Sequence, residues 1–401
     1  MASDDAQQVL RYPIPASAVL APPAEWARLR QRCPVARVAL PSGDEALLLT
    51  RHADVKQILA DPRFGRLLTA PDAARISPSE PGGVFDSPRE TSELQTGGGH
   101  QRWRRTVGQW FTAKRMAALR PGIEATAERL VEDMVERGQP ADLKASLAFP
   151  LPVWVICDLL GVPVADRDSF GYWSDTMLNL TRYTPGEVAA AQAEFAEYLT
   201  ALITAKRAEP GEDLLSELIS GTGWSERQLV ATAQGLLVAG HETTTNMIGK
   251  MMVMLLADRR RWERLLADRS LVRTAVEEAL RFDANAGFGI PRYIGAEVEV
   301  GDTVLHRGTT VVCNLAAANR DENVFDGAAE MNLDRTPNPH LAFGVGAHAC
   351  LGQALARTEL RTVLDVLLRT LPSLELAAGV DELRRIEGLV VGGLREVPVR
   401  W

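Results

Sequence analysis

Apolar residues recur at helical spacing through most of this chain, whereas the alternation typical of strands is sparse. The helical pattern covers residues 26–32, 53–59, 101–109, 123–136, 187–206, 226–256, 261–266, 271–281 and 351–369. Alternating segments at 35–40 and 46–50 predict one hairpin, and short segments at 297–300, 303–305 and 310–314 predict further strand pairing. The pattern predicts a mainly α protein with a small β portion.

The chain shows no obvious boundary between domains. Its 401 residues contain no Gly/Ser-rich or Pro-rich linker and no internal repeat. We expect a flexible N-terminus at residues 1–12 and a single domain at residues 13–401. Hydrophobic residues make up 46% of the chain and charged residues 24%, which is typical of soluble globular proteins.

The charge and the N-terminal sequence argue against binding to nucleic acid, secretion and insertion into a membrane. The net charge of −8 argues against general nucleic-acid binding. The first residues are acidic, unlike a signal peptide, and the most apolar long window, residues 147–164, is interrupted by prolines and an aspartate. Few and scattered cysteines agree with a reducing compartment. We expect a cytoplasmic monomer that binds neither nucleic acid nor membrane.

One cysteine lies in a setting that suits metal ligation. Residues 343–352 read Phe-Gly-Val-Gly-Ala-His-Ala-Cys-Leu-Gly, and a helical pattern starts near Leu351. Backbone N–H groups of a first helical turn would favour the ionised thiolate of Cys350, and glycines let the main chain approach a flat cofactor. The alternatives are a buried, inert cysteine and a zinc site, for which the other three cysteines are too scattered.

This stretch resembles the haem-binding loop of the cytochrome P-450 family, because it matches the pattern Phe-Gly-x-Gly-x-His-x-Cys-x-Gly at every position. The resemblance implies the cytochrome P-450 fold, haem b as cofactor and Cys350 as the iron ligand, with Phe343, Gly344 and Gly352 beside the haem. Thiolate donation to the iron favours O–O cleavage once oxygen is bound. We therefore expect a haem-thiolate monooxygenase that activates O2.

The helix expected at residues 226–256 is unusual at its centre. Ser225 and Gln228 have the spacing of a capping box, which predicts where the helix starts. Gly240 and the threonines that follow it lower helix propensity, so the sequence tolerates a weakened turn. A merely kinked helix with a surface glutamate is the alternative to a functional site.

The family resemblance implies a role for this central turn. Ala239 and Gly240 would lie beside the haem, with Gly240 leaving space for oxygen. Thr243 would hydrogen-bond the bound oxygen, and Glu242 would relay protons to it from solvent. The adjacent His241 points in another direction on a helix, so we expect it to face protein.

Charged residues outside this helix have implied roles too. Glu278 and Arg281 lie three apart and therefore on one helical face. The resemblance implies that they pair with Arg335 and hold the loop that carries the cysteine. As an isolated surface pair they would contribute little stability.

Haem carries two propionates, which need cationic partners. His100 and Arg104 lie four apart on a predicted helix and resemble the family's propionate-binding pair. Arg292 and His348 match two further cationic positions of the family. We expect these four side chains to converge, although each alone reads as a surface cation.

Basic residues gather in two segments that the resemblance places on the proximal side of the haem. An acidic ferredoxin, reduced by a ferredoxin reductase with electrons from NAD(P)H, would dock there. A solvated face with ordinary salt bridges is the alternative. The residues are Arg102, Arg104, Arg105, Lys114, Arg115, Arg357 and Arg361.

The substrate pocket is expected from family position. The small-residue run at 284–289 predicts room for a bulky substrate, with an aromatic ring available for stacking. The alternative is that these are tight packing positions. The expected pocket residues are Gly235, Val238, Ala239, Phe288 and Leu389.

The resulting expectation is a bacterial enzyme of the actinomycete type that oxidises a medium-sized apolar or aromatic secondary metabolite, as in antibiotic biosynthesis. A tryptophan-containing cyclodipeptide is one such substrate, oxidised by hydroxylation or by oxidative coupling. Two other classes stay open. They are a haem-thiolate peroxygenase that uses H2O2 and a non-catalytic haem-thiolate sensor or binding protein.

Overall fold

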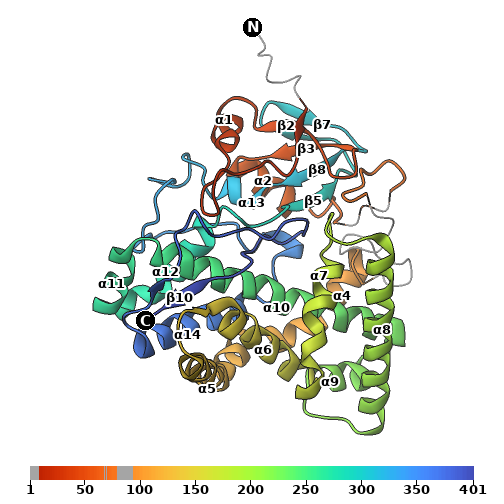
Figure 1. The fold of residues 1–401 in the computed structure, drawn as a ribbon. Coiled ribbons are helices and arrows are strands. Elements are labelled where there is room, and N and C mark those ends of the chain that lie inside the picture. The colour runs from red at the N-terminus through yellow and green to blue at the C-terminus, as the bar shows by residue number, and fades with distance from the viewer. Residues whose placement is uncertain (1–8, 67, 69, 79–93) are drawn as a thin grey trace.

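A computed structural model describes residues 9–66, 68, 70–78 and 94–401 of the chain. Figure 1 shows a sheet-rich region at the top and a larger helical region below it. Strands from distant parts of the sequence meet in the upper region, where N-terminal strands pair with a strand from the second half of the chain. Among the described residues, no helix is both long and apolar enough to cross a membrane.

The largest sheet has the strand order β1–β2–β3–β8–β5. The predicted hairpin is present, because β2 and β3 pair antiparallel. Strand β3 then pairs in parallel with β8 from the C-terminal half. These strands are β1 (Leu10–Arg11), β2 (Val35–Ala39), β3 (Glu45–Leu49), β5 (Ile290–Tyr293) and β8 (Thr310–Cys313).

Two smaller sheets complete the β portion of the described chain. One has the order β4–β10–β9, and the other pairs β6 with β7. Their strands are β4 (Ala141–Asp142), β6 (Val298–Val300), β7 (Thr303–Leu305), β9 (Glu375–Leu376) and β10 (Pro398–Arg400).

Helices dominate the remainder, as the apolar periodicity predicts. A short π-helical segment at Lys144–Ala148 precedes α6. The α-helices are α1 (Ala24–Arg32), α2 (His52–Ala60), α4 (Gly97–Gly108), α5 (Ala113–Arg137), α6 (Pro150–Leu160), α7 (Phe170–Met177), α8 (Pro185–Ala208), α9 (Leu214–Gly221), α10 (Glu226–Leu256), α11 (Arg259–Ala267), α12 (Val272–Phe282), α13 (Leu315–Ala318) and α14 (Gln353–Thr370).

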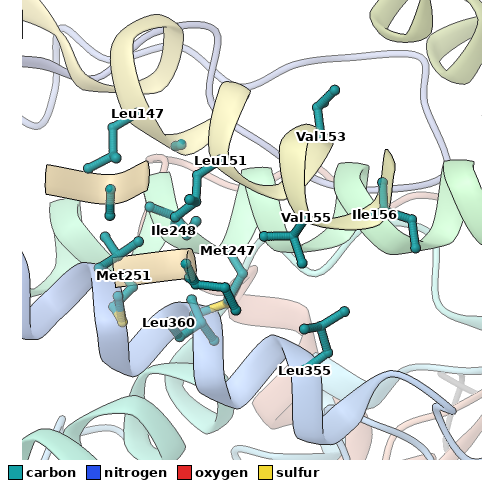
Figure 2. Close-up of a cluster of buried hydrophobic side chains, with 14 of the residues drawn as sticks. Leu147, Leu151, Val153, Val155, Ile156, Met247, Ile248, Met251, Leu355 and Leu360 are labelled. Atoms are coloured by element: carbon teal, nitrogen blue, oxygen red, sulfur yellow. The ribbon is translucent and has the colours of Figure 1, made fainter. Parts of the chain in front are cut away.

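The long helix α10 runs through the helical region, and most of its side chains are buried. The predicted capping box is present: Ser225 Oγ accepts a hydrogen bond from the Gln228 N–H at 3.3 Å, and Gln228 Oε1 accepts one from the Ser225 N–H at 3.0 Å. Figure 2 shows apolar side chains from α6, α10 and α14 meeting in one cluster, including Ile156, Met251 and Leu360. Each such burial contributes about 1.5–3 kcal/mol, which fixes α10 in place.

The expectation of a flexible N-terminus is wrong for residues 10–12; residues 1–8 lie outside the described part of the chain. Leu10 and Arg11 pair with β2 in the main sheet. Tyr12 is buried, and its ring meets the ring of Phe288 edge-on at 5.0 Å. Ladder hydrogen bonds and an aromatic contact therefore hold this segment.

Glu278 of α12 holds the segment that leads to the cysteine loop. Its fully buried carboxylate accepts two bonds from Arg281 at 2.8 Å and two from Arg335 Nε at 3.0 and 3.2 Å. The N–H of Asn332 and Nδ2 of Asn338 add bonds at 2.8 and 3.1 Å. The carboxylate of Glu278 thus binds an arginine of its own helix and three donors from the segment that precedes the cysteine loop.

Replacing this carboxylate should destabilise the protein strongly. In Glu278→Ala, Arg281 and Arg335 stay largely buried without their anion, which costs about 3–5 kcal/mol. Chemical denaturation measures this loss in the free energy of unfolding. Glu263→Ala is the control, because Glu263 is exposed and pairs with Arg259 at 3.4 Å; it should cost less than about 1 kcal/mol. Equal losses in the two variants would contradict the role of Glu278.

Candidate active site

The loop that carries Cys350 is a compact turn packed against the end of α2. The N–H of Cys350 donates to the carbonyl oxygen of Phe343 at 2.8 Å, which closes the loop. Gly344 and Gly346 have φ values of +62° and +78°. A Cβ at Gly346 would lie 2.7 Å from the carbonyl oxygen of Leu59, so both conformation and space require glycine there.

The thiol of Cys350 is accessible at the end of this loop. Although the thiol is accessible, the surrounding protein atoms partly desolvate it and raise its pKa. The N–H of Gly352 and the charges of Arg104 and Arg357 lower this pKa. The predicted N–H donation is thus present at Gly352, but α14 starts at Gln353 and not near Leu351. Burial therefore opposes the ionisation that these donors favour.

Four of the predicted cationic residues converge beside this loop. The rings of His100 and His348 lie 4.1 Å apart between centroids. Burial, together with the charges of His100, Arg292 and Arg104, lowers the pKa of His348 to about 3. His348 Nδ1 is buried without a hydrogen-bond partner among the described residues. The predicted set therefore comes together from α4, β5 and the cysteine loop.

A fifth cation belongs to this group. Burial lowers the pKa of Arg66, and its charge lowers the pKa of His100, Arg292 and His348. No sequence pattern indicated Arg66, because this residue lies in a loop and has no helical spacing to another cation. The loop after α2 folds back to β5, where Gly65 forms a β-bridge with Tyr293. This contact between distant segments brings Arg66 to the site, and no local pattern could reveal it.

This cation cluster, defined as Arg66, His100, Arg104, Arg292 and His348, fits a dianionic ligand. Among the described residues, no carboxylate forms an ion pair with its three arginines. Burying several like charges without a counter-charge is unfavourable. Two carboxylates of a flat cofactor would supply that counter-charge, and the unpartnered His348 Nδ1 would gain an acceptor. The residues therefore fit a haem whose propionates lie at the cluster.

The long helix α10 presents one accessible stripe in its otherwise buried central part. Gly235, Ala239 and Thr243 are exposed and lie four apart, hence on one face. The hydroxyl of Thr243 donates to the carbonyl oxygen of Ala239 at 2.9 Å. The oxygen of this hydroxyl keeps lone pairs that can accept a hydrogen bond. The stripe therefore combines small residues with one polar group.

Gly240 serves a purpose that the sequence did not reveal. A Cβ at this position would lie 2.7 Å from two carbons of Ile156 on α6. Gly240 thus allows α6 and α10 to pack closely, and this contact explains the glycine independently of the expected space for oxygen. The helix also continues without a break through this turn.

Glu242 and His241 are both buried, with different surroundings. Glu242 Oε2 accepts a hydrogen bond from Asn246 Nδ2 at 2.8 Å. Burial, and to a smaller extent the nearby charge of Asp175, raise the pKa of Glu242 to about 7. His241 Nδ1 lies 2.7 Å from the Leu237 carbonyl oxygen, and burial lowers the His241 pKa to about 4. His241 therefore faces protein, as the sequence predicts.

Two expected pocket residues lie in the core instead. Phe288 is fully buried and packs against Tyr12, so its ring is not available for stacking on a substrate. Val238 is 3% exposed and points away from the accessible stripe. The helical spacing could not distinguish these faces, because the centre of α10 is buried almost all round.

Backbone packing fills part of the small-residue run at 284–289, whereas Ala286 and Gly287 are exposed. The N–H of Phe288 donates to the Val390 carbonyl oxygen at 2.8 Å, and the N–H of Val390 donates to the Leu178 carbonyl oxygen at 2.8 Å. A Cβ at Gly287, whose φ is +100°, would collide with the Val390 carbonyl. Close backbone packing explains the run, and Leu389 is largely buried in the same place.

Comparison with known proteins identifies the family. The family model described as "Cytochrome P450" matches residues 173–393. The chain is 41% identical over 389 residues to mycinamicin IV hydroxylase/epoxidase of Micromonospora griseorubida, with 94% of each chain covered. It is 39% identical over 388 residues to nocardicin C N-oxygenase of Nocardia uniformis subsp. tsuyamanensis, again with 94% of each covered.

Solved structures agree with this similarity. SgvP, which is involved in the tailoring step of griseoviridin, matches with a TM-score of 0.93 and 36% identity, over 98% of this chain and all of that one. The mixed-function P450 MycG matches with a TM-score of 0.86 and 38% identity over the same shares.

The chain belongs to the cytochrome P450 family and has its fold. Its family consists of haem-thiolate oxidoreductases that use haem b. The cation cluster fits that cofactor. The described residues contain no group of three or more His, Cys, Asp or Glu side chains arranged to hold a metal ion, so a zinc site has no ligand set there.

Proposed function

We propose that this protein is a haem-thiolate monooxygenase that transfers oxygen from O2 to a secondary metabolite. The observation that carries the proposal is the pair formed by accessible Thr243 and buried Glu242 at the centre of α10. A peroxygenase or a haem sensor needs no such acid–alcohol pair. When bound, the haem supplies the oxygen activation and the thiolate ligand promotes O–O cleavage.

The residues divide into those that hold the cofactor and those that manage protons. Cys350 is the iron ligand, and the cation cluster binds the propionates. Phe343, Gly344 and Gly352 shape the proximal surface, and Ala239 contributes to the distal one. Thr243 accepts a hydrogen bond at the site, while Glu242, whose pKa lies near 7, gains and releases protons at neutral pH.

The substrate class follows from the accessible stripe and from the relatives. Gly235 and Ala239 offer a small, apolar surface beside Thr243. Relatives are named for mycinamicin IV and nocardicin C, which are chemically different molecules. We propose a medium-sized secondary metabolite as substrate; a tryptophan-containing cyclodipeptide, hydroxylated or coupled, stays a hypothesis. We also propose that the enzyme works in the cytoplasm as a monomer and that residues 13–401 form its single domain.

Bacterial relatives of this kind generally take electrons from a ferredoxin and its reductase. We propose that a ferredoxin docks on the exposed side chains of Arg102, Arg105 and Arg115. The expected contribution of Arg361 needs correction. Arg361 and Arg357 both bind Glu277, at 2.9 and 2.8 Å, so their charge is partly neutralised within the protein.

Removing the hydroxyl of Thr243 should separate electron consumption from product formation. In Thr243→Ala no hydroxyl accepts a hydrogen bond at the site, so O2 that has taken up two electrons from NADPH and two protons would leave as H2O2 before it reacts with substrate. Product formed per NADPH should fall by roughly tenfold or more, with H2O2 rising in proportion and haem content unchanged. Thr243→Ser, which keeps the hydroxyl, should restore most of the coupling. An unchanged product yield in Thr243→Ala would refute the role of the pair.

Charge reversal on the docking face should weaken reduction by ferredoxin in a salt-dependent way. Arg102→Glu combined with Arg105→Glu should slow reduction about tenfold at low salt and less at high salt, because exposed charges are screened beyond ~8–10 Å. Stopped-flow reduction at several salt concentrations measures the effect. Arg129→Glu is the control, since Arg129 is 58% exposed on α5 and pairs with Asp133. If Arg129→Glu slows reduction as much as the double variant does, the ferredoxin does not dock at Arg102 and Arg105.

A further inference from the structure

Glu242 has a second acidic neighbour that the family pattern did not indicate. Asp175 lies on α7, and its carboxyl group is hydrogen-bonded to that of Glu242. Glu242 is 6% exposed, whereas the side chain of Asp175 is 20% exposed. The two acids therefore span the distance between the buried centre of α10 and the protein surface.

A hydrogen bond between two carboxyl groups requires one proton on the pair. Two carboxylates in contact repel each other, so one group keeps a proton and donates it to the other. The position of that proton depends on the surrounding charges.

Burial raises the pKa of Asp175, and nearby cations and hydrogen bonds oppose this effect and favour its charge. Arg182 Nη1 lies 3.0 Å from Asp175 Oδ2, and the Tyr183 hydroxyl donates a hydrogen bond to the same oxygen at 3.3 Å. Lys144 is close to both acids, but its Nζ donates to the Leu394 carbonyl oxygen at 2.8 Å, and Asp142 lies nearby.

The environment of Glu242 instead favours the proton. Its remaining polar neighbour within hydrogen-bond distance is the amide of Asn246, and the adjacent His241 faces Phe149 on another side. Burial, together with the charge of Asp175, raises the pKa of Glu242. The stable arrangement is a protonated Glu242 that donates to an ionised Asp175.

We propose that Glu242 and Asp175 form an acid–carboxylate pair through which protons pass from the surface to helix α10, with Asp175 as the solvent-side member. Glu242 releases its proton towards the site, and Asp175 takes one from water and passes it to Glu242. One proton enters for each proton delivered, and no electron moves. This inference rests on the proposed role of Glu242 and adds Asp175 as the residue that reloads it.

The test follows the protonation of Glu242 in the resting haem-loaded protein by infrared spectroscopy. The carbonyl stretch of a neutral carboxyl group should disappear with a midpoint near pH 7, and Glu242→Gln should lack this band. Asp175→Asn removes the like charge, so the midpoint should fall by roughly one unit. Arg182→Ala removes a cation at an exposed position, so the midpoint should rise. Asp133→Asn, a surface acid on α5, should leave it unchanged.

The same variants test whether Asp175 reloads Glu242. Asp175→Asn should lower product formed per NADPH, and Asp175→Glu should restore it. An unchanged midpoint in both Asp175→Asn and Arg182→Ala would overturn the pair. If the midpoints shift as expected but Glu242→Gln keeps full coupling, the pair stands and the proposed role of Glu242 fails. The two failures are thus distinguishable.

Discussion

The positive charge gathered at Arg66, His100, Arg104, Arg292 and His348 is the constraint on which the site depends. Among the described residues, no carboxylate pairs with these arginines, although ion pairs are frequent elsewhere in the protein. Such a cluster is unfavourable by itself and becomes favourable when a dianion supplies the counter-charge. Because the cluster lies beside Cys350, one bound molecule can satisfy both.

The scaffold holds this charged site through buried contacts of a different kind. Apolar packing of α6, α10 and α14 fixes the distal helix, and Gly240 permits the close approach of Ile156. On the proximal side, Glu278 binds Arg281 and Arg335 and thereby anchors the segment before the cysteine loop. Stability and function are therefore separated: neutralised ion pairs support the fold, and the unneutralised cations of the cluster fit the carboxylates of a haem.

Sequence patterns predicted the parts of the site that depend on local order. The cysteine loop and the capping box follow from short motifs, and the convergence of His100 with His348 follows from the family resemblance. Arg66 and Asp175 were missed, because their roles arise from contacts between segments that no spacing relates. Phe288 was placed in the pocket wrongly, since a run of glycines serves equally well for tight backbone packing and for open space.

The rate at which haem leaves the protein tests the central claim most directly. Haem transfer to an excess of apomyoglobin would be followed for Arg66→Gln and for Arg63→Gln, whose exposed side chain binds Asp61. If the cation cluster holds the propionates, Arg66→Gln should lose haem about tenfold faster or more, which corresponds to ~1.4 kcal/mol, while Arg63→Gln should match the parent protein. Equal rates for all three proteins would contradict the account.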